Sequence, residues 1–206
     1  SIVSRFVGDN GAWRPLKMLK TPVARQGLKT LRSILPATRQ TEALVIDPPG
    51  QTIKTTVFYF PGCGSERVFS NISMASLYLL LDNQVRVILP PPYRCCGYPF
   101  QVNAKKALYN TVVVENSIMF SRIREMFSDL SFDACLVSCG TCMEALEKLD
   151  ADRVFGSRVT DISNYMIDQG IDFKLSEPYL YHEPCHDSLR HNAPDLLNSF
   201  AVDQPV

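Results

Sequence analysis

Two kinds of apolar run alternate along the middle of this chain. Short runs rich in β-branched and aromatic residues occur at 55–60 (TTVFYF), 85–89 (VRVIL) and 133–138 (DACLVS), as is typical of buried strands. Longer runs with helical spacing lie between them. We therefore expect helices over residues 70–83, 103–128, 141–149 and 161–170, and a fourth strand over 178–183 (PYLYHE).

Strands that alternate with helices predict an α/β fold, with a small parallel sheet and crossover helices on its faces. In such sheets, ligands bind beyond the carboxyl ends of the strands. The longest helical run, 103–128, has its apolar residues on one stripe, formed by Leu108, Val112, Met119, Ile123 and Phe127.

Residues 1–50 differ from the rest of the chain in composition. This composition predicts an irregular basic N-terminal arm and linker before a domain over 51–206. Glycines and prolines interrupt the arm, leaving one short helix within 22–35 and a linker at 46–51 (IDPPGQ). Residues 1–40 contain eight Lys or Arg and one acid, Asp9, a net charge of +7 in a chain that is neutral overall. Because aromatic residues are not interleaved, we expect the arm to contact a neighbouring domain and not nucleic acid.

The 206-residue chain shows no apolar run of the roughly 18 residues that a transmembrane helix needs. Its first residues lack the apolar core of a signal peptide. We therefore expect a cytoplasmic protein, or one attached peripherally to the inner membrane. The first residue is Ser1, so we expect a processed protein or an excised piece.

Seven cysteines are many for one domain, and without an export signal metal binding or redox chemistry explains them better than disulfides. Cys135 lies inside the third predicted strand, so we expect it to be a small core residue. The other six all follow a predicted strand and should meet at one edge of the sheet: Cys63, Cys95, Cys96, Cys139, Cys142 and Cys185.

The residues around these cysteines favour close approach to an inorganic ligand. Cys63 is flanked by glycines, and Gly97 follows the Cys95-Cys96 pair. Residues 139–142 (CGTC) begin a predicted helix, whose positive end should lower the pKa of both thiols. Structural zinc needs four ligands, and a dithiol site would use only the CxxC pair, whereas an iron–sulfur cluster can use all these thiols. We favour the cluster, with zinc and a dithiol redox site as alternatives.

Three motifs resemble a known family. PGC at 61–63, CCG at 95–97 and CGTC at 139–142 occur in the order found in the cysteine-rich CCG domain. That domain occurs in heterodisulfide reductase, in the iron–sulfur subunit of glycolate oxidase and in lactate-utilisation proteins. Residues 58–70 and 136–146 are most similar to the C-terminal iron–sulfur region of large FAD-linked oxidases.

The resemblance implies a [4Fe–4S] cluster, non-cubane in the heterodisulfide reductase relatives, held by Cys63, Cys95, Cys96, Cys139 and Cys142. It also implies an electron-transfer domain in a flavin-linked 2-hydroxy-acid dehydrogenase or oxidase. The FAD would sit in a partner domain or subunit, next to a ferredoxin-like domain, because this chain has no Gly-rich dinucleotide loop. The alternatives are a catalytic cluster that reduces a disulfide and a zinc-binding docking module.

Residues 181–190 (YHEPCHDSLR) resemble the segment that begins a second CCG repeat, which would here be truncated within 181–206. Cys185 is therefore either the first cysteine of that repeat or a sixth metal ligand. We expect His182 and His186 to pack or to form hydrogen bonds, with a mixed site that includes Cys185 as the alternative.

Overall fold

The fold is built on a five-stranded sheet in which four strands are parallel. The computed structural model describes residues 30–50, 52–171, 182–190 and 193. The strands are β1 (Leu44–Ile46), β2 (Thr55–Phe60), β3 (Val85–Leu89), β4 (Ala134–Val137) and β5 (Val159–Asp161).

The predicted α/β architecture is confirmed. β2 lies in the middle of the order β1-β3-β2-β4-β5 and pairs in parallel with β3 and β4, and β4 pairs in parallel with β5. Two details differ from the prediction. The strand β1 was not expected and pairs antiparallel with β3, and β5, which was also not expected, forms the other edge of the sheet beside β4. Both edge strands have three residues, which is too short for a periodic pattern to be recognised in the sequence.

The helices agree with the predicted spacing except around the cysteines, where short helices occur. The helix expected over 103–128 begins later, at Lys106, because a turn in which Ala104 has a φ of 54° separates it from a short helix over Tyr98–Val102 that was not predicted. Leu108 on its predicted apolar stripe is 49% exposed. The helices are η3 (Leu31–Ser33, 3₁₀), α2 (Gly62–Arg67), α3 (Ser70–Asp82), α4 (Tyr98–Val102), α5 (Lys106–Met126), α6 (Gly140–Lys148), α7 (Ala151–Phe155) and α8 (Ile162–Asp168).

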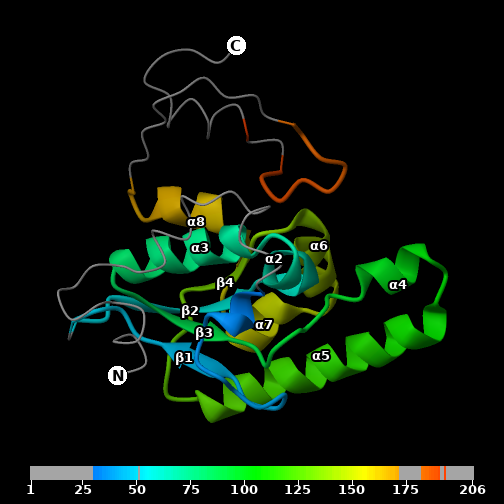
Figure 1. The fold of residues 1–206 in the computed structure, drawn as a ribbon, viewed down its shortest axis with the longest axis horizontal. Coiled ribbons are helices and arrows are strands. Elements are labelled where there is room, and N and C mark those ends of the chain that lie inside the picture. The colour runs from blue at the N-terminus through cyan, green and yellow to red at the C-terminus, as the bar shows by residue number, and fades with distance from the viewer. Residues whose placement is uncertain (1–29, 51, 172–181, 191–192, 194–206) are drawn as a thin grey trace.

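Helices cover both faces of the sheet (Figure 1). Alternate residues of β2 enter opposite cores, because successive strand side chains point to opposite faces. Val57 and Tyr59 pack in the core that includes α3 and α8. Phe58 and Phe60 pack in the core that includes α5, α6 and α7. With both faces buried, the strands read as continuous apolar runs.

Part of the segment assigned to the arm packs against the sheet domain. Leu31 in η3 is fully buried. Arg32 forms a buried ion pair with Glu66 of α2 and donates a hydrogen bond of 2.6 Å to the carbonyl oxygen of Pro90. Since Glu66 and Pro90 belong to the segments that follow β2 and β3, Arg32 joins two of the loops that carry cysteines.

Two further expectations concern the ends of the described region. Residues 178–181 of the predicted fourth strand lie outside the described residues, and His182 and Glu183 belong to no strand. Residues 1–29 of the predicted arm also lie outside them. Within the described ranges, no helix has both the length and the hydropathy needed to cross a membrane.

Candidate metal centre

Three consecutive loops bring five cysteines to one edge of the sheet. Cys63 lies in α2 directly after β2, and Cys95 and Cys96 lie between β3 and α4. Cys139 is the N-cap of α6, directly after β4, and Cys142 lies in the first turn of that helix. The strands β2, β3 and β4 are parallel neighbours, so their carboxyl ends point the same way. The helices α2, α4 and α6 lie near this edge (Figure 1).

These five thiols form one continuous series of contacts, which we call the thiol cluster. The sulfur atoms of Cys63 and Cys95 lie 3.7 Å apart. Cys95 in turn is hydrogen-bonded to Cys96, Cys96 to Cys142, and Cys142 to Cys139. Residues distant in the chain thus become neighbours, as their place after parallel strands predicted.

The thiol cluster has a buried side and a more open side. Cys96 and Cys142 are each only 2% exposed. Cys63, Cys95 and Cys139 are partly exposed. A bound group would therefore meet protein on one side and solvent or a ligand on the other.

Two glycines make the close approach of these segments possible. Gly62 has a φ of 70°, and a Cβ atom there would lie 2.6 Å from the sulfur of Cys142. Gly97 has a φ of 95°, and its N–H lies 3.4 Å from the sulfur of Cys95. Such φ values are readily adopted only by glycine. The turn at Gly97 follows two neighbouring cysteines that contact different thiols, Cys63 in one case and Cys142 in the other.

The thiols differ in acidity because each hydrogen bond favours one partner's charged form. A hydrogen bond with Cys142 lowers the pKa of Cys139 to about 5, against the effect of burial. Hydrogen bonds with Cys142 and Cys95 also lower the pKa of Cys96. Cys139 and Cys96 are therefore the thiols most ready to act as thiolates.

The expectation that the pKa of Cys142 falls with that of Cys139 is wrong. Hydrogen bonds with Cys139 and Cys96, followed by burial, raise the pKa of Cys142. In both contacts the charged form of Cys142 is the one disfavoured, and this outweighs its place near the start of α6. A hydrogen bond with Cys95, then burial, likewise raises the pKa of Cys63.

The remaining two cysteines stand apart from the thiol cluster. Cys135 lies within β4, is fully buried and packs in the same core as Phe58, as predicted. Burial raises the pKa of its thiol. Cys185 is exposed, and among the described residues no contact joins its sulfur to the thiol cluster.

His186 links the segments that carry the second and third cysteine motifs. Its Nε2 lies 2.7 Å from the hydroxyl of Tyr98, and its Nδ1 lies 2.6 Å from a carboxylate oxygen of Glu144. Its backbone also lies against Gly140, where an added Cβ atom would lie only 1.7 Å from the carbonyl oxygen of His186. The sequence analysis missed Tyr98 and Glu144, although each lies two residues after a cysteine of the thiol cluster.

The thiol cluster offers more sulfur donors than a single metal ion takes. Among the described residues, no group of three or more His, Cys, Asp or Glu side chains is arranged to hold one. Five soft sulfur donors exceed the four of a tetrahedral zinc site. The donor set therefore suits a group with several metal atoms better than a single ion.

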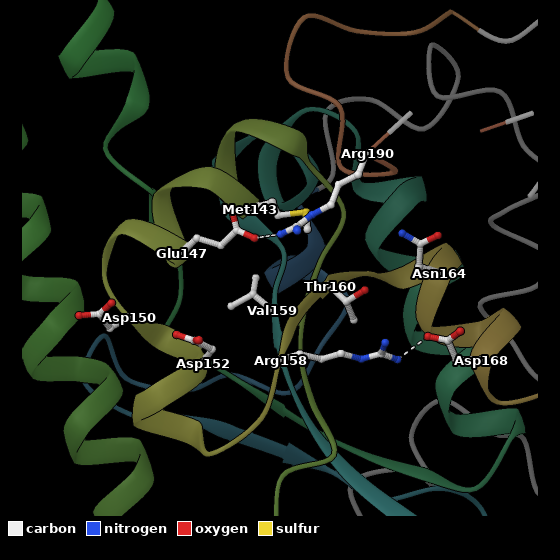
Figure 2. Close-up of a pocket in the computed structure, with 10 residues that line it drawn as sticks. All are labelled: Met143, Glu147, Asp150, Asp152, Arg158, Val159, Thr160, Asn164, Asp168 and Arg190. Carbon is white, nitrogen blue, oxygen red and sulfur yellow. Dashed lines mark hydrogen bonds and ion pairs between the residues drawn. The ribbon is translucent and has the colours of Figure 1, made fainter. Parts of the chain in front are cut away.

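Two cavities lie near the predicted site region. The first, which we call the cysteine cavity, has a volume of about 370 Å³ and opens on Cys63 and Cys95. The second, the edge cavity, has a volume of about 520 Å³, lies beside β5 and α8, and contains no cysteine (Figure 2). Of these two, the cysteine cavity is the one that gives access to the thiol cluster.

Comparison with known proteins agrees with the motifs. Residues 57–147 match the family model of the CCG cysteine-rich domain. The chain is 28% identical over 135 residues to an uncharacterized iron-sulfur protein of Methanococcus maripaludis, a match covering 65% of this chain and 26% of that protein. It is 26% identical over 140 residues to an uncharacterized iron-sulfur protein of Methanocaldococcus jannaschii, covering 67% of this chain and 27% of that protein.

The chain thus spans about a quarter of the length of these two curated relatives. No solved structure matches it. The matched region, 57–147, contains all five members of the thiol cluster and excludes Cys185. The predicted resemblance to the CCG cysteine-rich domain is thus confirmed by the family-model match over residues 57–147.

Proposed function

We propose that this domain binds an iron–sulfur cluster through Cys63, Cys95, Cys96, Cys139 and Cys142 and serves as an electron-transfer module. The observation that carries the proposal is the thiol cluster itself, in which five thiols from three loops are in contact. The names of the two relatives, both iron–sulfur proteins, support it. A [4Fe–4S] cluster, non-cubane as in the heterodisulfide reductase relatives, would use all five thiols.

The backbone near the thiol cluster fits such a group. Gly62 leaves open the space next to the Cys142 sulfur that a side chain would fill. The N–H of Gly97 points toward the Cys95 sulfur, and the hydroxyl of Thr141 lies 3.1 Å from the Cys139 sulfur. Hydrogen bonds to ligating sulfur atoms raise or lower the reduction potential of iron–sulfur clusters. Gly97 and Thr141 are therefore the residues that would adjust that potential.

When bound, the cluster would supply one-electron chemistry, and the protein would hold it and limit its contact with solvent. Cys96 and Cys142 would anchor its buried side, and Cys63, Cys95 and Cys139 its more open side. The thiols would be deprotonated on binding, since thiolate is the form that ligates metal. Cys139, whose pKa is already lowered to about 5, would lose its proton most easily.

In this proposal the wider system is a flavin-linked 2-hydroxy-acid dehydrogenase or oxidase in the cytoplasm. The support is the likeness of residues 58–70 and 136–146 to large FAD-linked oxidases. The hydroxy-acid chemistry and the FAD would belong to another domain or subunit, with a ferredoxin-like domain as a further relay. Lactate, glycolate and 2-hydroxyglutarate are the substrates that this likeness suggests.

The first test is the metal content of oxygen-free protein. We expect brown protein with broad absorbance near about 400 nm and with iron and sulfide in equal amounts. Colourless protein that carries one zinc ion per chain would contradict the proposal and would favour the docking module. Because iron–sulfur clusters can be lost in air, the measurement requires anaerobic purification.

A second function, reduction of a disulfide at the cluster, is favoured by one observation. The cysteine cavity gives a small molecule access to Cys63 and Cys95. Two molecules of one-electron-reduced viologen would supply the two electrons, and two protons from water would complete the conversion of the disulfide into two thiols. Turnover by cluster-loaded protein would favour this function, and no turnover by fully loaded protein would leave electron transfer.

A further inference from the structure

The cysteine cavity has walls of three chemical kinds. Cys63 and Cys95 of the thiol cluster form one wall. Phe100 and Val112 supply apolar surface. Polar and charged groups supply the third wall, which is formed by Arg67, Arg94, Tyr93, Glu115 and Asn116. The cavity volume of about 370 Å³ is within the usual range of small-molecule sites, about 300–1,000 Å³.

Arg67 is an exposed cation that rests on an aromatic ring. Its guanidinium carbon lies 4.5 Å from the centre of the Tyr93 ring. Among the described residues, no carboxylate lies within ion-pair distance of Arg67. A guanidinium stacked on a ring keeps its N–H edge available, so Arg67 can still bind a carboxylate with two hydrogen bonds.

The edge cavity shows the opposite arrangement. Figure 2 shows Arg158 directed at Asp168 and Arg190 directed at Glu147, and both pairs are ion pairs. Since the protein neutralises both of these arginines, the described lining of the edge cavity offers no free guanidinium to an anionic ligand. Of the two cavities, the cysteine cavity is therefore the one that contains an arginine without a carboxylate partner among the described residues.

Tyr93, which supports Arg67, is held in a strained conformation. Its φ is 62°, in the left-handed region that bulky residues rarely adopt. Its hydroxyl lies 3.4 Å from the hydroxyl of Thr30. Strain of this kind is found mainly where function requires a particular geometry.

Arg94 adds a second, partly neutralised cation. Its guanidinium lies 3.5 Å from a carboxylate oxygen of Glu115, and it donates a hydrogen bond to the carbonyl oxygen of Gln40. Its Nε is buried without a hydrogen-bond partner among the described residues. Among the Arg and Glu side chains that line the cavity, Arg67 and Arg94 are positive and Glu115 is negative.

We propose that the cysteine cavity binds a small organic carboxylate with an apolar stem. Arg67 on Tyr93 would bind the carboxylate, and Phe100 and Val112 would contact the stem. The far end of the molecule would lie against the open side of the thiol cluster. The inference deepens the proposed function and rests on it for the identity of the group that Cys63 and Cys95 hold.

The experiment measures binding of hexanoate to the 206-residue chain by ligand-observed NMR, with and without the cluster. Hexanamide, which has the same stem and no charge, is the control ligand. We expect hexanoate to bind at least about tenfold more tightly than hexanamide, because only the carboxylate can form an ion pair with two parallel hydrogen bonds to Arg67. Hexanoate should also change the electron paramagnetic resonance spectrum of the reduced cluster.

Two matched variants test which arginine is responsible. Arg67→Gln should weaken hexanoate binding by about tenfold and leave hexanamide binding unchanged. Arg158→Gln, which removes an arginine from the edge cavity, should leave both unchanged. Equal binding of the two ligands, or wild-type hexanoate binding by Arg67→Gln, would overturn the proposal.

Failure of this inference can be told apart from failure of the proposed function. Protein that contains iron and sulfide but does not prefer hexanoate would refute only the carboxylate site. Protein that never acquires iron and sulfide but prefers hexanoate, with loss of that preference in Arg67→Gln, would support the site and refute the proposed function. A change of cluster potential in Arg67→Gln without any change in binding would mean that Arg67 only balances the charge of the cluster.

Discussion

The interior of β4 and the end of β4 place the same residue type in two different environments. Cys135 lies in the strand and packs against aromatic and aliphatic side chains. Cys139, four residues later, caps α6 and contacts the Cys142 thiol. Burial raises the pKa of Cys135, whereas the contact with Cys142 lowers that of Cys139. The position of a cysteine relative to the strand end thus decides its chemistry.

Burial by itself does not make this distinction. Cys96 and Cys142 are 2% exposed, and Cys135 is 0% exposed. What differs is the neighbours, since Cys96 and Cys142 contact other thiols and Cys135 does not. A cysteine in this fold is therefore expected to bind metal because of the sulfur atoms around it, whether it is buried or open.

The comparison is tested most strongly by removing single sulfur atoms. In Cys96→Ser and Cys139→Ser, we expect the iron and sulfide content to fall below about a tenth of the wild-type value, because a ligand is lost. In Cys135→Ser, the content should stay at the wild-type level. Metal analysis of anaerobically purified protein measures both.

Protein stability supplies the second half of that test. Cys135→Ser places a hydroxyl in an apolar core and should lower the free energy of unfolding by about 1–3 kcal/mol, measured by denaturant titration. If all three variants lost iron and sulfide equally, the division between strand interior and strand end would be wrong.

The space beside the thiols is tested by adding one methyl group. Gly62→Ala would place a Cβ atom 2.6 Å from the Cys142 sulfur, so we expect loss of most of the cluster. Gly156→Ala is a matched control, because Gly156 has a similar φ of 66° and open space around its Cβ position. Both substitutions carry a backbone cost of about 1–2 kcal/mol, but only Gly62→Ala should reduce the iron content. Equal iron content in the two would contradict the close contact.

Removing the hydrogen bonds of His186 should affect the protein less than the substitutions above. His186→Ala removes hydrogen bonds to Tyr98 and Glu144 and should destabilise the docking of residues 186–190 by about 1–2 kcal/mol. Amide hydrogen exchange in this segment should become faster, and the cluster should be lost sooner in air. His182→Ala, at an exposed neighbouring histidine, is the control. Unchanged exchange in His186→Ala would mean that other contacts hold the segment.

The smallest effect is expected at Cys185. Because this residue is exposed and makes no described contact with the thiol cluster, Cys185→Ser should leave iron, sulfide and the visible spectrum unchanged. Loss of iron in this variant would make Cys185 a sixth ligand and would require the segment around it to move toward the thiol cluster.

Local patterns were sufficient to predict the parallel strands β2, β3 and β4 and most helices. These three strands are short apolar runs rich in β-branched and aromatic residues, and such runs are recognisable without tertiary information. The edge strands β1 and β5 were not predicted, because three residues carry too little pattern and their pairing depends on the neighbouring strand. The direction of the pKa shift at Cys142 was also missed, because it arises from contacts with Cys96 and Cys139 and not from the helix that begins there.

That five cysteines follow three parallel strands could be inferred from local patterns, because strand and helix periodicity are local and indicate where each loop begins. The folded chain was needed to show which of those thiols are buried and that Tyr98, Glu144 and His186 meet. It was also needed to show that Arg67 faces a cavity without a carboxylate partner among the described residues. These features depend on how side chains from distant segments pack. No property of a single segment specifies them.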